Sequence, residues 1–483
     1  MEYKWIALSN TTLGTLMASL DANIVIIALP TIARDLPGTP LFDLLWIILG
    51  YQLVTASVLV NFGRLADIFG RVKLYNVGFA VFTLGSALCS VAQSGTQLIA
   101  FRMVQALGAA FLFSNGAAIL TDAFPANERG RALGTNQVAI VVGSVLGLVL
   151  GGFLTSWVGW RAIFWVNVPI GLFATLWSHF RLKELGTIRA GQRIDLPGNV
   201  SFAAGLSLML AGLTLYSLGS LDFAHFLGVE AVGVALMLLF FAIERRVKDP
   251  MLDLSLFRTR LFTAGNVAIF LNALARGAVS LVLVFYLQGP TMGLDPLAAG
   301  IFLVPISATL AFFGPLSGWL SDRYGARVLS TLGLLVSSAG FLLLTRVGAR
   351  TTFDHLAVPL ILVGGGMGIF ASPNRASIMN SVRAEARGIA SGTSVTLNNV
   401  GMTFSLAFAF VVLTASTPLK DLELIFLGSS GIGNAPWIGS FISSVHSVFY
   451  FSTAFLLLAI LPSVVRGPEE ARRKKGAGFK SAD

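Results

Sequence analysis

The chain has 483 residues, of which 55% are hydrophobic and 12% are charged, and its formal net charge is +10. Ordinary soluble domains carry about 25% charged residues, so this chain has too little polar material for a water-exposed surface. The composition argues against a soluble enzyme, a nucleic-acid binder and a disordered protein, and it favours a protein whose solvent is the lipid bilayer.

Residues that commonly bind metals are scarce. Cys89 is the single cysteine, which excludes an intramolecular disulfide and a metal cluster held by cysteines. The four histidines are scattered and form no ligand pair at helical spacing: His179, His225, His355 and His446. We therefore expect neither a bound metal nor a cofactor.

Fourteen apolar runs are long enough to cross about 30 Å of hydrocarbon as helices of about 20 residues. In chain order they are Trp5–Leu29, Leu44–Phe62, Leu74–Val91, Leu98–Leu120, Leu133–Phe153, Ile163–Trp177, Leu196–Leu218, Leu227–Ile243, Phe262–Leu287, Ala298–Ser317, Leu329–Thr345, Ala357–Ile378, Ile389–Leu413 and Val445–Val465. The sequence thus predicts an all-α membrane protein with fourteen spans.

The basic residues indicate the orientation of these spans. With the N-terminus inside, 25 of the 33 Lys and Arg residues fall in cytoplasmic segments, 5 fall in outer loops and 3 fall within spans. Cytoplasmic loops of membrane proteins are enriched in Lys and Arg, so we expect both termini in the cytoplasm. The net charge then needs no nucleic-acid partner. We expect the basic tail after residue 465 to contact anionic lipids.

Two charged residues lie inside the first and fourth spans. Asp21 is well inside the first span, and Arg102 lies in the fourth, followed one turn later by Gln105. Measured along the helices, both charges lie at a similar depth in the outer half of the bilayer, so they can pair. A carboxyl that changes protonation inside a membrane suits proton coupling, whereas a fixed ion pair would only lock two helices together. Both interpretations stay open.

The pattern G-x-L-x-D-x-x-G occurs twice, 255 residues apart, after the second and tenth spans. The glycines and charged residues of interest are Gly63, Asp67, Gly70 and Arg71 in the first copy and Gly318, Asp322, Arg323 and Gly325 in the second. Repeated halves with a site between them are typical of secondary transporters. We expect each Asp to pair with a basic group on a neighbouring helix end, forming a cytoplasmic latch. We expect the loops at 128–131 and 385–388 to supply these basic groups. The alternative is that the positive charges only keep this side of the protein in the cytoplasm.

Four glycines recur on one stripe of the fifth span: Gly143, Gly147, Gly151 and Gly152. Small residues at this spacing allow a second helix to approach closely. Generic packing would explain the spacing on its own.

Arg276 lies near the middle of the ninth predicted span, where an arginine is costly. It could pair with a carboxylate, bind an anionic group of a substrate, or lie in water. Its presence argues against a purely cationic substrate.

These features together resemble the major facilitator superfamily, specifically its fourteen-span drug:proton antiporter branch. The resemblance covers the chain from Leu20 to about Val465. It implies two pseudo-symmetric six-helix bundles at 1–180 and 261–465, with two additional central transmembrane helices within 181–260 and a basic cytoplasmic tail at 466–483.

The resemblance also implies roles for the buried charges. The segment Leu20–Pro30 is similar to the first-span signature L-D-x-T-x-V-N-x-A-L-P of the branch, whose Asp is linked to coupling and cation binding. Asn23 and Ile27 depart from that signature. The stretch that begins at Arg102 is similar to the fourth-span motif R-x-x-Q-G-x-G-A-A, which is linked to proton transfer, and Ala106 replaces its first glycine.

The stripe of glycines is similar to the antiporter motif G-x-x-x-G-P-x-x-G-G, with Leu148 at the proline position. In the family this motif is regarded as a close helix contact that limits uncoupled leak. It favours export by antiport over symport.

We therefore expect a monomeric, multi-pass protein of the cell membrane that binds protons and a small molecule, and that exports amphipathic or cationic drugs and toxic compounds by alternating-access antiport. The alternative within transport is a proton-coupled carrier of a specific metabolite or an anionic compound. A membrane-embedded enzyme is disfavoured because the sequence contains no metal-ligand pair, no G-x-S-x-G and no phosphate-binding loop. A channel or lipid scramblase is disfavoured because the doubled gate motif argues for alternation between two states.

Overall fold

The computed structural model describes residues 2–36, 38–125, 128–186, 195–248, 250–349, 351–383, 386–426 and 437–467, apart from the side chains of Asp322 and Trp437. Three expectations therefore lie wholly or partly outside the described residues. They concern the basic tail beyond Gly467, the side chain of Asp322, and the loop at 385–388, of which residue 385 is not described.

Regular structure in the described part of the chain is entirely helical. The helices are α1 (Tyr3–Asp35), α2 (Leu41–Phe69), α3 (Arg71–Ser90), α4 (Gly95–Ala123), α5 (Arg129–Trp157), α6 (Ala162–Trp165), α7 (Asn167–Arg181), α8 (Leu196–Ser217), α9 (Phe223–Glu244), the 3-10 helix η1 (Leu254–Arg258), α10 (Arg260–Arg276), α11 (Val279–Gln288), α12 (Pro296–Tyr324), α13 (Ala326–Leu344), α14 (Phe353–Asn380), α15 (Arg387–Ser416), α16 (Leu419–Phe426) and α17 (Trp437–Val465). Fourteen candidate membrane spans result, as the hydropathy pattern predicts.

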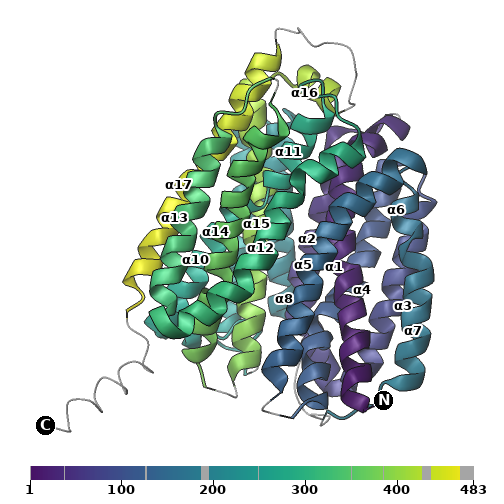
Figure 1. The fold of residues 1–483 in the computed structure, drawn as a ribbon, viewed down its shortest axis with the longest axis vertical. Helices are drawn as coiled ribbons and strands as arrows, with labels where there is room; N and C mark the ends of the chain where they lie inside the picture. The colour runs from purple at the N-terminus through teal and green to yellow at the C-terminus, as the bar shows by residue number, and fades with distance from the viewer. Residues whose placement is uncertain are drawn as a thin grey trace, which may run out of the picture.

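The spans form two bundles that lie side by side (Figure 1). In the N-terminal half, α1 packs against α5, and α4 packs against α2 and α3; in the C-terminal half, α14 packs against α12 and α13, and α10 packs against α15 and α17. The hairpin of α8 and α9 is the additional pair, and α8 contacts both α2 and α15. The fold is thus two six-span bundles with two further helices between them in sequence.

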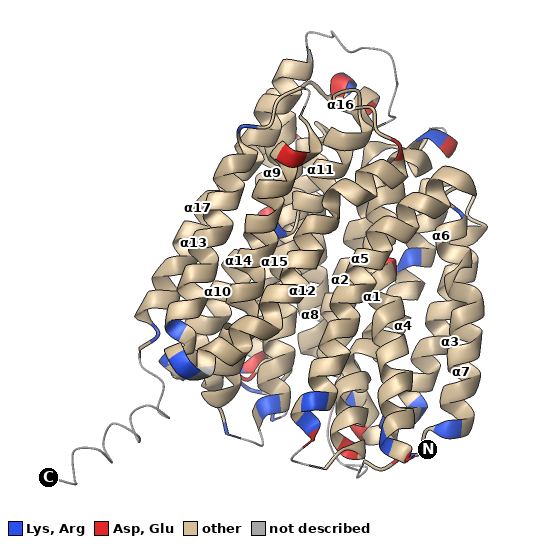
Figure 2. Cartoon of the chain, viewed as in Figure 1, with Lys and Arg blue, Asp and Glu red and all other residues tan. Residues whose placement is uncertain are grey.

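Charge separates the two ends of this molecule. Helix α1 begins at the same end at which α17 finishes, and Lys and Arg gather there, whereas the middle of the spans carries few charges (Figure 2). We call this end the basic face and the other end the opposite face. The basic face includes the first residues of α3, α5, α10 and α15, namely Arg71, Arg129, Arg260 and Arg387.

The doubled sequence pattern is repeated in the backbone. Gly70 ends α2 with φ 105° and Gly325 ends α12 with φ 84°, both in the left-handed region that favours glycine. A Cβ placed on Gly63 would face Ser114 of α4 at 3.9 Å, and one on Gly318 would face Ser372 of α14 at 3.6 Å. Corresponding glycines therefore make corresponding contacts in the two halves.

The same region corrects the predicted ends of two spans. The sequence places the G-x-L-x-D-x-x-G segments after the second and tenth predicted spans, but most of each segment is the last turns of a helix: Gly63 and Asp67 belong to α2, and Gly318 and Arg323 belong to α12. Each connection is a single glycine. The reason is that one residue with positive φ reverses the chain between two long helices and needs no longer loop.

Two spans are interrupted, which hydropathy does not predict. The sixth span consists of α6 and α7, and the ninth consists of α10 and α11 with a break at Gly277 and Ala278. At the second break the backbone N–H of Ala278 donates a hydrogen bond to Ser405 Oγ of α15 at 3.0 Å. A side chain from a neighbouring helix thus satisfies the interrupted backbone.

Candidate functional site

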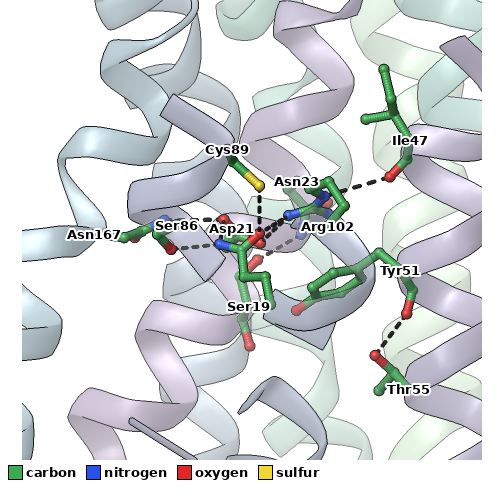
Figure 3. Close-up of polar contacts among 11 residues, drawn as sticks. Ser19, Asp21, Asn23, Ile47, Tyr51, Thr55, Ser86, Cys89, Arg102 and Asn167 are labelled. Carbon is green, nitrogen blue, oxygen red and sulfur yellow. Dashed lines mark hydrogen bonds and ion pairs between the residues drawn. The ribbon is translucent and has the colours of Figure 1, made fainter. Parts of the chain in front are cut away.

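Asp21 lies at the centre of a buried hydrogen-bond network in the N-terminal half (Figure 3). Its Oδ2 accepts from Arg102 Nη1 at 2.5 Å, and its Oδ1 accepts from Gln105 Nε2 at 2.8 Å and from Asn167 Nδ2 at 3.0 Å. Arg102 and Gln105 are three residues apart on α4, so both point from one face of that helix towards α1. The structure therefore brings together three of the residues that the sequence singles out.

The network continues beyond the ion pair into three further helices. Gln105 Nε2 also donates to Ser86 Oγ of α3 at 2.6 Å, while Gln105 Oε1 accepts from Arg102 Nη1 at 2.6 Å. The guanidinium of Arg102 lies over the ring of Tyr51 of α2, 4.0 Å from the ring centre. Asn167 comes from α7. Helices α1, α2, α3, α4 and α7 thus all contribute to the surroundings of one carboxylate.

Burial makes this network sensitive to a single proton. Asp21 is 0% exposed and Arg102 is 1% exposed, so the pair is cut off from solvent. A buried ion pair tolerates burial only while both charges are present, because removing one leaves the other uncompensated. Protonation of Asp21 would therefore unbalance the interior of the bundle.

Sequence reasoning missed Asn167, Ser86 and Tyr51. No helical spacing links them to Asp21, because they lie on three other helices. For Asn167 a signal was available, since an amide inside an apolar span needs a polar partner. That signal indicates the existence of a contact without identifying the partner.

Arg276 has a different environment. It is the last residue of α10, partly buried, and its Nη2 donates to Asn398 Oδ1 of α15 at 2.9 Å. Within the described part of the chain it forms no salt bridge. Of the three sequence-based options for Arg276, pairing with a carboxylate of the chain is therefore not observed.

The surroundings of Arg276 lie where the two halves meet. Thr403 Oγ1 of α15 donates to Gln52 Oε1 of α2 at 3.4 Å, a contact between the C-terminal and N-terminal halves. A Cβ on Gly277 would lie 2.6 Å from the carbonyl oxygen of Met402, so α10 and α15 touch closely beside Arg276. The broken ninth span thus places an arginine against a polar stretch of α15.

At the basic face, Arg71 links the ends of three helices. Its Nη2 lies 2.7 Å from Asp67 Oδ1 of α2, and its Nη1 lies 2.8 Å from Asp122 Oδ2 of α4. The first latch motif therefore has an acidic partner, Asp122, that sequence reasoning did not identify.

The expected partner loop is engaged elsewhere. Glu128 pairs with Lys4 at 3.0 Å, and Arg129 Nε donates to the carbonyl oxygen of Phe124 at 3.1 Å. The prediction that this loop supplies the partner of Asp67 is wrong for this structure, because Arg71, four residues along the chain, is already in reach. In the second copy Arg323 lies over the ring of Trp319, 5.2 Å from its centre.

The glycines of α5 face two helices. A Cβ on Gly143 would lie 2.7 Å from the Leu16 carbonyl oxygen, and one on Gly147 would lie 2.6 Å from that of Leu20. Gly151 faces the side chain of Ile24 in the same way, at 2.7 Å. These three positions therefore allow the backbone of α1, which carries Asp21, to touch α5.

Gly152 faces the other half of the molecule. A Cβ there would lie 2.5 Å from the carbonyl oxygen of Pro296, the first residue of α12. Conversely, a Cβ on Gly300 of α12 would lie 2.5 Å from the carbonyl oxygen of Leu148. Nearby, Gln288 Nε2 donates to the carbonyl oxygen of Ile27 at 2.8 Å. The two halves are thus in direct contact towards the opposite face.

Comparisons with known proteins agree with this architecture. The family model described as Major Facilitator Superfamily matches residues 11–406. The chain is 33% identical to the riboflavin transporter RibZ of Clostridioides difficile, over 93% of this chain and 98% of that protein. It is 35% identical to the multidrug resistance protein Stp of Mycobacterium tuberculosis, over 84% of this chain and 75% of that protein.

Among solved structures, a bacterial homologue of the human lysosomal transporter Spinster superposes with a TM-score of 0.68, covering 96% of this chain and 97% of that one at 16% identity. This likeness concerns the fold alone. With the matched family model, the fourteen candidate spans and drug-resistance proteins among its relatives, the chain belongs to the major facilitator superfamily of secondary transporters, in its fourteen-span branch.

Proposed function

We propose that this protein is a proton-coupled antiporter that exports amphipathic organic compounds across the cell membrane by alternating access. The observation that carries the proposal is the buried network in which Asp21 binds Arg102, Gln105 and Asn167. The names of relatives support export, since several are multidrug resistance proteins.

Coupling follows from the charge balance of the N-terminal half. As a carboxylate, Asp21 neutralises Arg102; as a neutral acid it leaves a buried guanidinium uncompensated. The helices around Arg102 must then repack, so the two protonation states favour different arrangements. A compound that binds one arrangement better shifts the equilibrium towards it and thereby expels the proton.

In the orientation we propose, the basic face lies in the cytoplasm, because 25 of the 33 Lys and Arg residues then lie on the cytoplasmic side. Arg71, held by Asp67 and Asp122, would stabilise the N-terminal half at that face and loosen when the half changes its arrangement. The contact of α5 with α12 would close the path to the outside in the described state.

The decisive experiment measures proton release from the purified protein in weakly buffered detergent solution when compounds from a panel are added. We expect the native protein to release protons with at least one amphipathic compound, and Asp21→Asn to release none with that compound. The control is Asp222→Asn, an exposed carboxylate that caps α9 and pairs with His225. Unchanged release in Asp21→Asn would overturn the role of Asp21.

A carrier dedicated to one metabolite is the second candidate. It is favoured by the relative named a riboflavin transporter, which this chain matches over 98% of that protein's length. Proton release with riboflavin alone, and with no other member of the panel, would favour this candidate over a multidrug exporter.

A further inference from the structure

We infer that Arg276 and Asn398 bind an anionic group, a carboxylate or a phosphate, of the transported compound, so that the preferred substrates are amphipathic acids. This inference rests on the proposed transport function and adds the charge of the substrate to it.

The first argument is the distribution of acidic residues. The six spans of the C-terminal half contain one acidic residue, Asp354, which lies in the first turn of α14 at the opposite face. Arg276 is 16 residues from the start of the span Arg260–Gln288 and 12 residues from its end. At about 1.5 Å per residue it lies deep in the membrane, where its own half offers no counter-charge.

Among the described residues, neither the N-terminal half nor the additional pair of α8 and α9 supplies a counter-charge. Asp21, its deeply placed carboxylate, is 0% exposed and already bound to Arg102. Glu230 lies on α9, which packs against α8, whereas α10 packs against α14, α15 and α17. An arginine without a counter-ion inside the membrane is costly unless it binds water or an anion.

The second argument is the geometry of Arg276. A guanidinium has five N–H donors in a planar fork that suits carboxylate and phosphate oxygens. Among the described residues, Arg276 makes one hydrogen bond, to a neutral amide oxygen, Asn398 Oδ1, at 2.9 Å. Asn398 Nδ2 is only weakly engaged, 3.4 Å from Asn399 Oδ1 and 3.6 Å from Met402 Sδ. Asn398 thus orients the guanidinium of Arg276 and leaves its other N–H groups available to a ligand.

The third argument is position. One turn beyond Asn399, Thr403 contacts Gln52 of the other half at 3.4 Å, so this stretch of α15 lies at the boundary between the halves. The span also breaks directly after Arg276, where Ala278 N–H donates to Ser405 Oγ. A ligand held here would touch elements that must separate or rearrange when the two halves move.

The contrast with Arg102 strengthens the inference. Both arginines lie inside spans, yet Arg102 is 1% exposed and neutralised by Asp21, whereas Arg276 is partly exposed and has no acidic partner in the described part of the chain. A cationic compound at the boundary would meet the positive charge of Arg276, and no free carboxylate has been found there within the described residues. We therefore expect the preferred substrates to be acids rather than cations.

The test uses matched pairs of fluorescent probes that differ by one acidic group: rhodamine 110, with a free carboxylate, against its methyl ester rhodamine 123, and riboflavin 5′-phosphate against riboflavin. Affinities are measured with the purified full-length protein by fluorescence anisotropy. We expect the native protein to bind the acid of at least one pair at least tenfold more tightly. Arg276→Gln should lose this preference through weaker binding of the acid, with the neutral or esterified partner changed less than twofold.

Two further variants separate recognition from folding and from general loss of charge. Asn398→Asp is nearly isosteric and places a carboxylate against Arg276, so it should weaken binding of the acid as Arg276→Gln does. Arg375→Gln removes the charge of another arginine, near the basic-face end of α14 where the side chain is exposed, and should leave the preference unchanged. Each variant is checked by size-exclusion chromatography and thermal unfolding.

Equal affinities within every pair, failure to bind any acid, or an equal loss for both members in Arg276→Gln would each overturn the inference. Proton release in Asp21→Asn tests the proposed function separately. If release depends on Asp21 while the probe preference is absent or ignores Arg276, the antiporter proposal stands and the anion site fails. If the preference depends on Arg276 without any proton release, the anion site stands and proton coupling fails.

Discussion

The amide of Asn167 is the contact through which α7 reaches the carboxylate of Asp21. Its Nδ2 donates to Oδ1 at 3.0 Å, and Gln105 donates to the same oxygen at 2.8 Å. A hydrogen bond to a buried charged group replaces part of the hydration that the group loses on burial. Asn167 therefore ties α7 to the ion pair of Asp21 and Arg102.

We expect Asn167→Ala to weaken substrate-induced proton release and to lower the unfolding temperature. A hydrogen bond to a charged group contributes about 1.5–3 kcal/mol, and its loss removes the contact by which α7 holds the network around Asp21. The measurements are the protons released per protein when the compound is added and thermal unfolding of the purified protein.

The matched control for that change is Asn115→Ala. Asn115 is as deeply buried, on α4, but among the described residues its Nδ2 donates to the Phe111 carbonyl oxygen of its own helix alone. It should lower thermal stability without reducing proton release. An equal loss of release in both variants, or full release in Asn167→Ala, would contradict the role given to Asn167.

At this scale the sequence predicts the ion pair but not its surroundings. Asp21 and Arg102 are identifiable because charges inside apolar spans are rare and costly, and equal depth predicts that they can meet. Asn167 and Tyr51 are not identifiable in this way, since their contacts depend on how α7 and α2 rotate about their axes. Rotation is set by packing over whole helices, which no local spacing records.

Among the elements, α5 determines how closely α1 can lie to its neighbours. Gly143 and Gly147 place the α5 backbone against the carbonyl oxygens of Leu16 and Leu20, directly before Asp21. Small residues at such contacts allow close packing in membranes. Helix α1 therefore cannot shift without changing its contact with α5.

We expect Gly147→Val to impair transport and to lower the unfolding temperature. A Cβ at this position would lie 2.6 Å from the Leu20 carbonyl oxygen, so α1 must move away and carry Asp21 with it. Overpacking of this kind typically costs about 1–3 kcal/mol. The assays are substrate-dependent proton transport in proteoliposomes and thermal unfolding of the purified protein.

Gly134→Val is the comparison on the same helix, because a Cβ on Gly134 would have no atom within 4 Å. It should retain transport and stability near those of the native protein. If both valine variants behave alike, helix propensity rather than the contact with α1 explains the effect, and the interpretation of the glycine stripe is wrong.

The number and order of spans follow from the sequence, and the interruptions do not. Hydropathy suffices for the fourteen spans because only apolar helices of this length cross a bilayer unaided. The break at Ala278 depends on a hydrogen bond from its N–H to Ser405, which lies more than a hundred residues further along the chain. Such a break is a tertiary feature, so the local pattern around Arg276 predicts an unbroken helix.

For the whole molecule, the two halves carry different charges although they share a fold. The repeat places Gly70 and Gly325 in equivalent turns with positive φ. However, the N-terminal half holds a neutralised pair, Asp21 and Arg102, whereas the C-terminal half holds Arg276, which pairs with no carboxylate of the described residues. We therefore propose that the first half exchanges the proton, that the second binds the substrate anion, and that the boundary between them links the two events.

That link requires the two halves to separate at the opposite face, where Gly152 of α5 lies against the start of α12. A leucine side chain there would meet the backbone of Pro296 and Leu297, since its Cβ would lie 2.5 Å from one carbonyl oxygen and 2.7 Å from one Cα. Backbone atoms of a packed helix cannot move out of the way by changing rotamer, as a side chain can. Gly152→Leu should therefore hold the halves apart at this face and reduce transport.

The separation can be measured by electron paramagnetic resonance with spin labels on cysteines introduced at Val158 of the N-terminal half and Phe353 of the C-terminal half. Both positions are exposed at the opposite face, and the native Cys89 is fully buried and will not compete for the label. We expect Gly152→Leu to shift the distance distribution to longer values. Gly228→Leu on α9, where a Cβ would meet no atom within 4 Å, should leave it unchanged. A folded Gly152→Leu protein with the native distribution would show that the contact between α5 and α12 does not control opening.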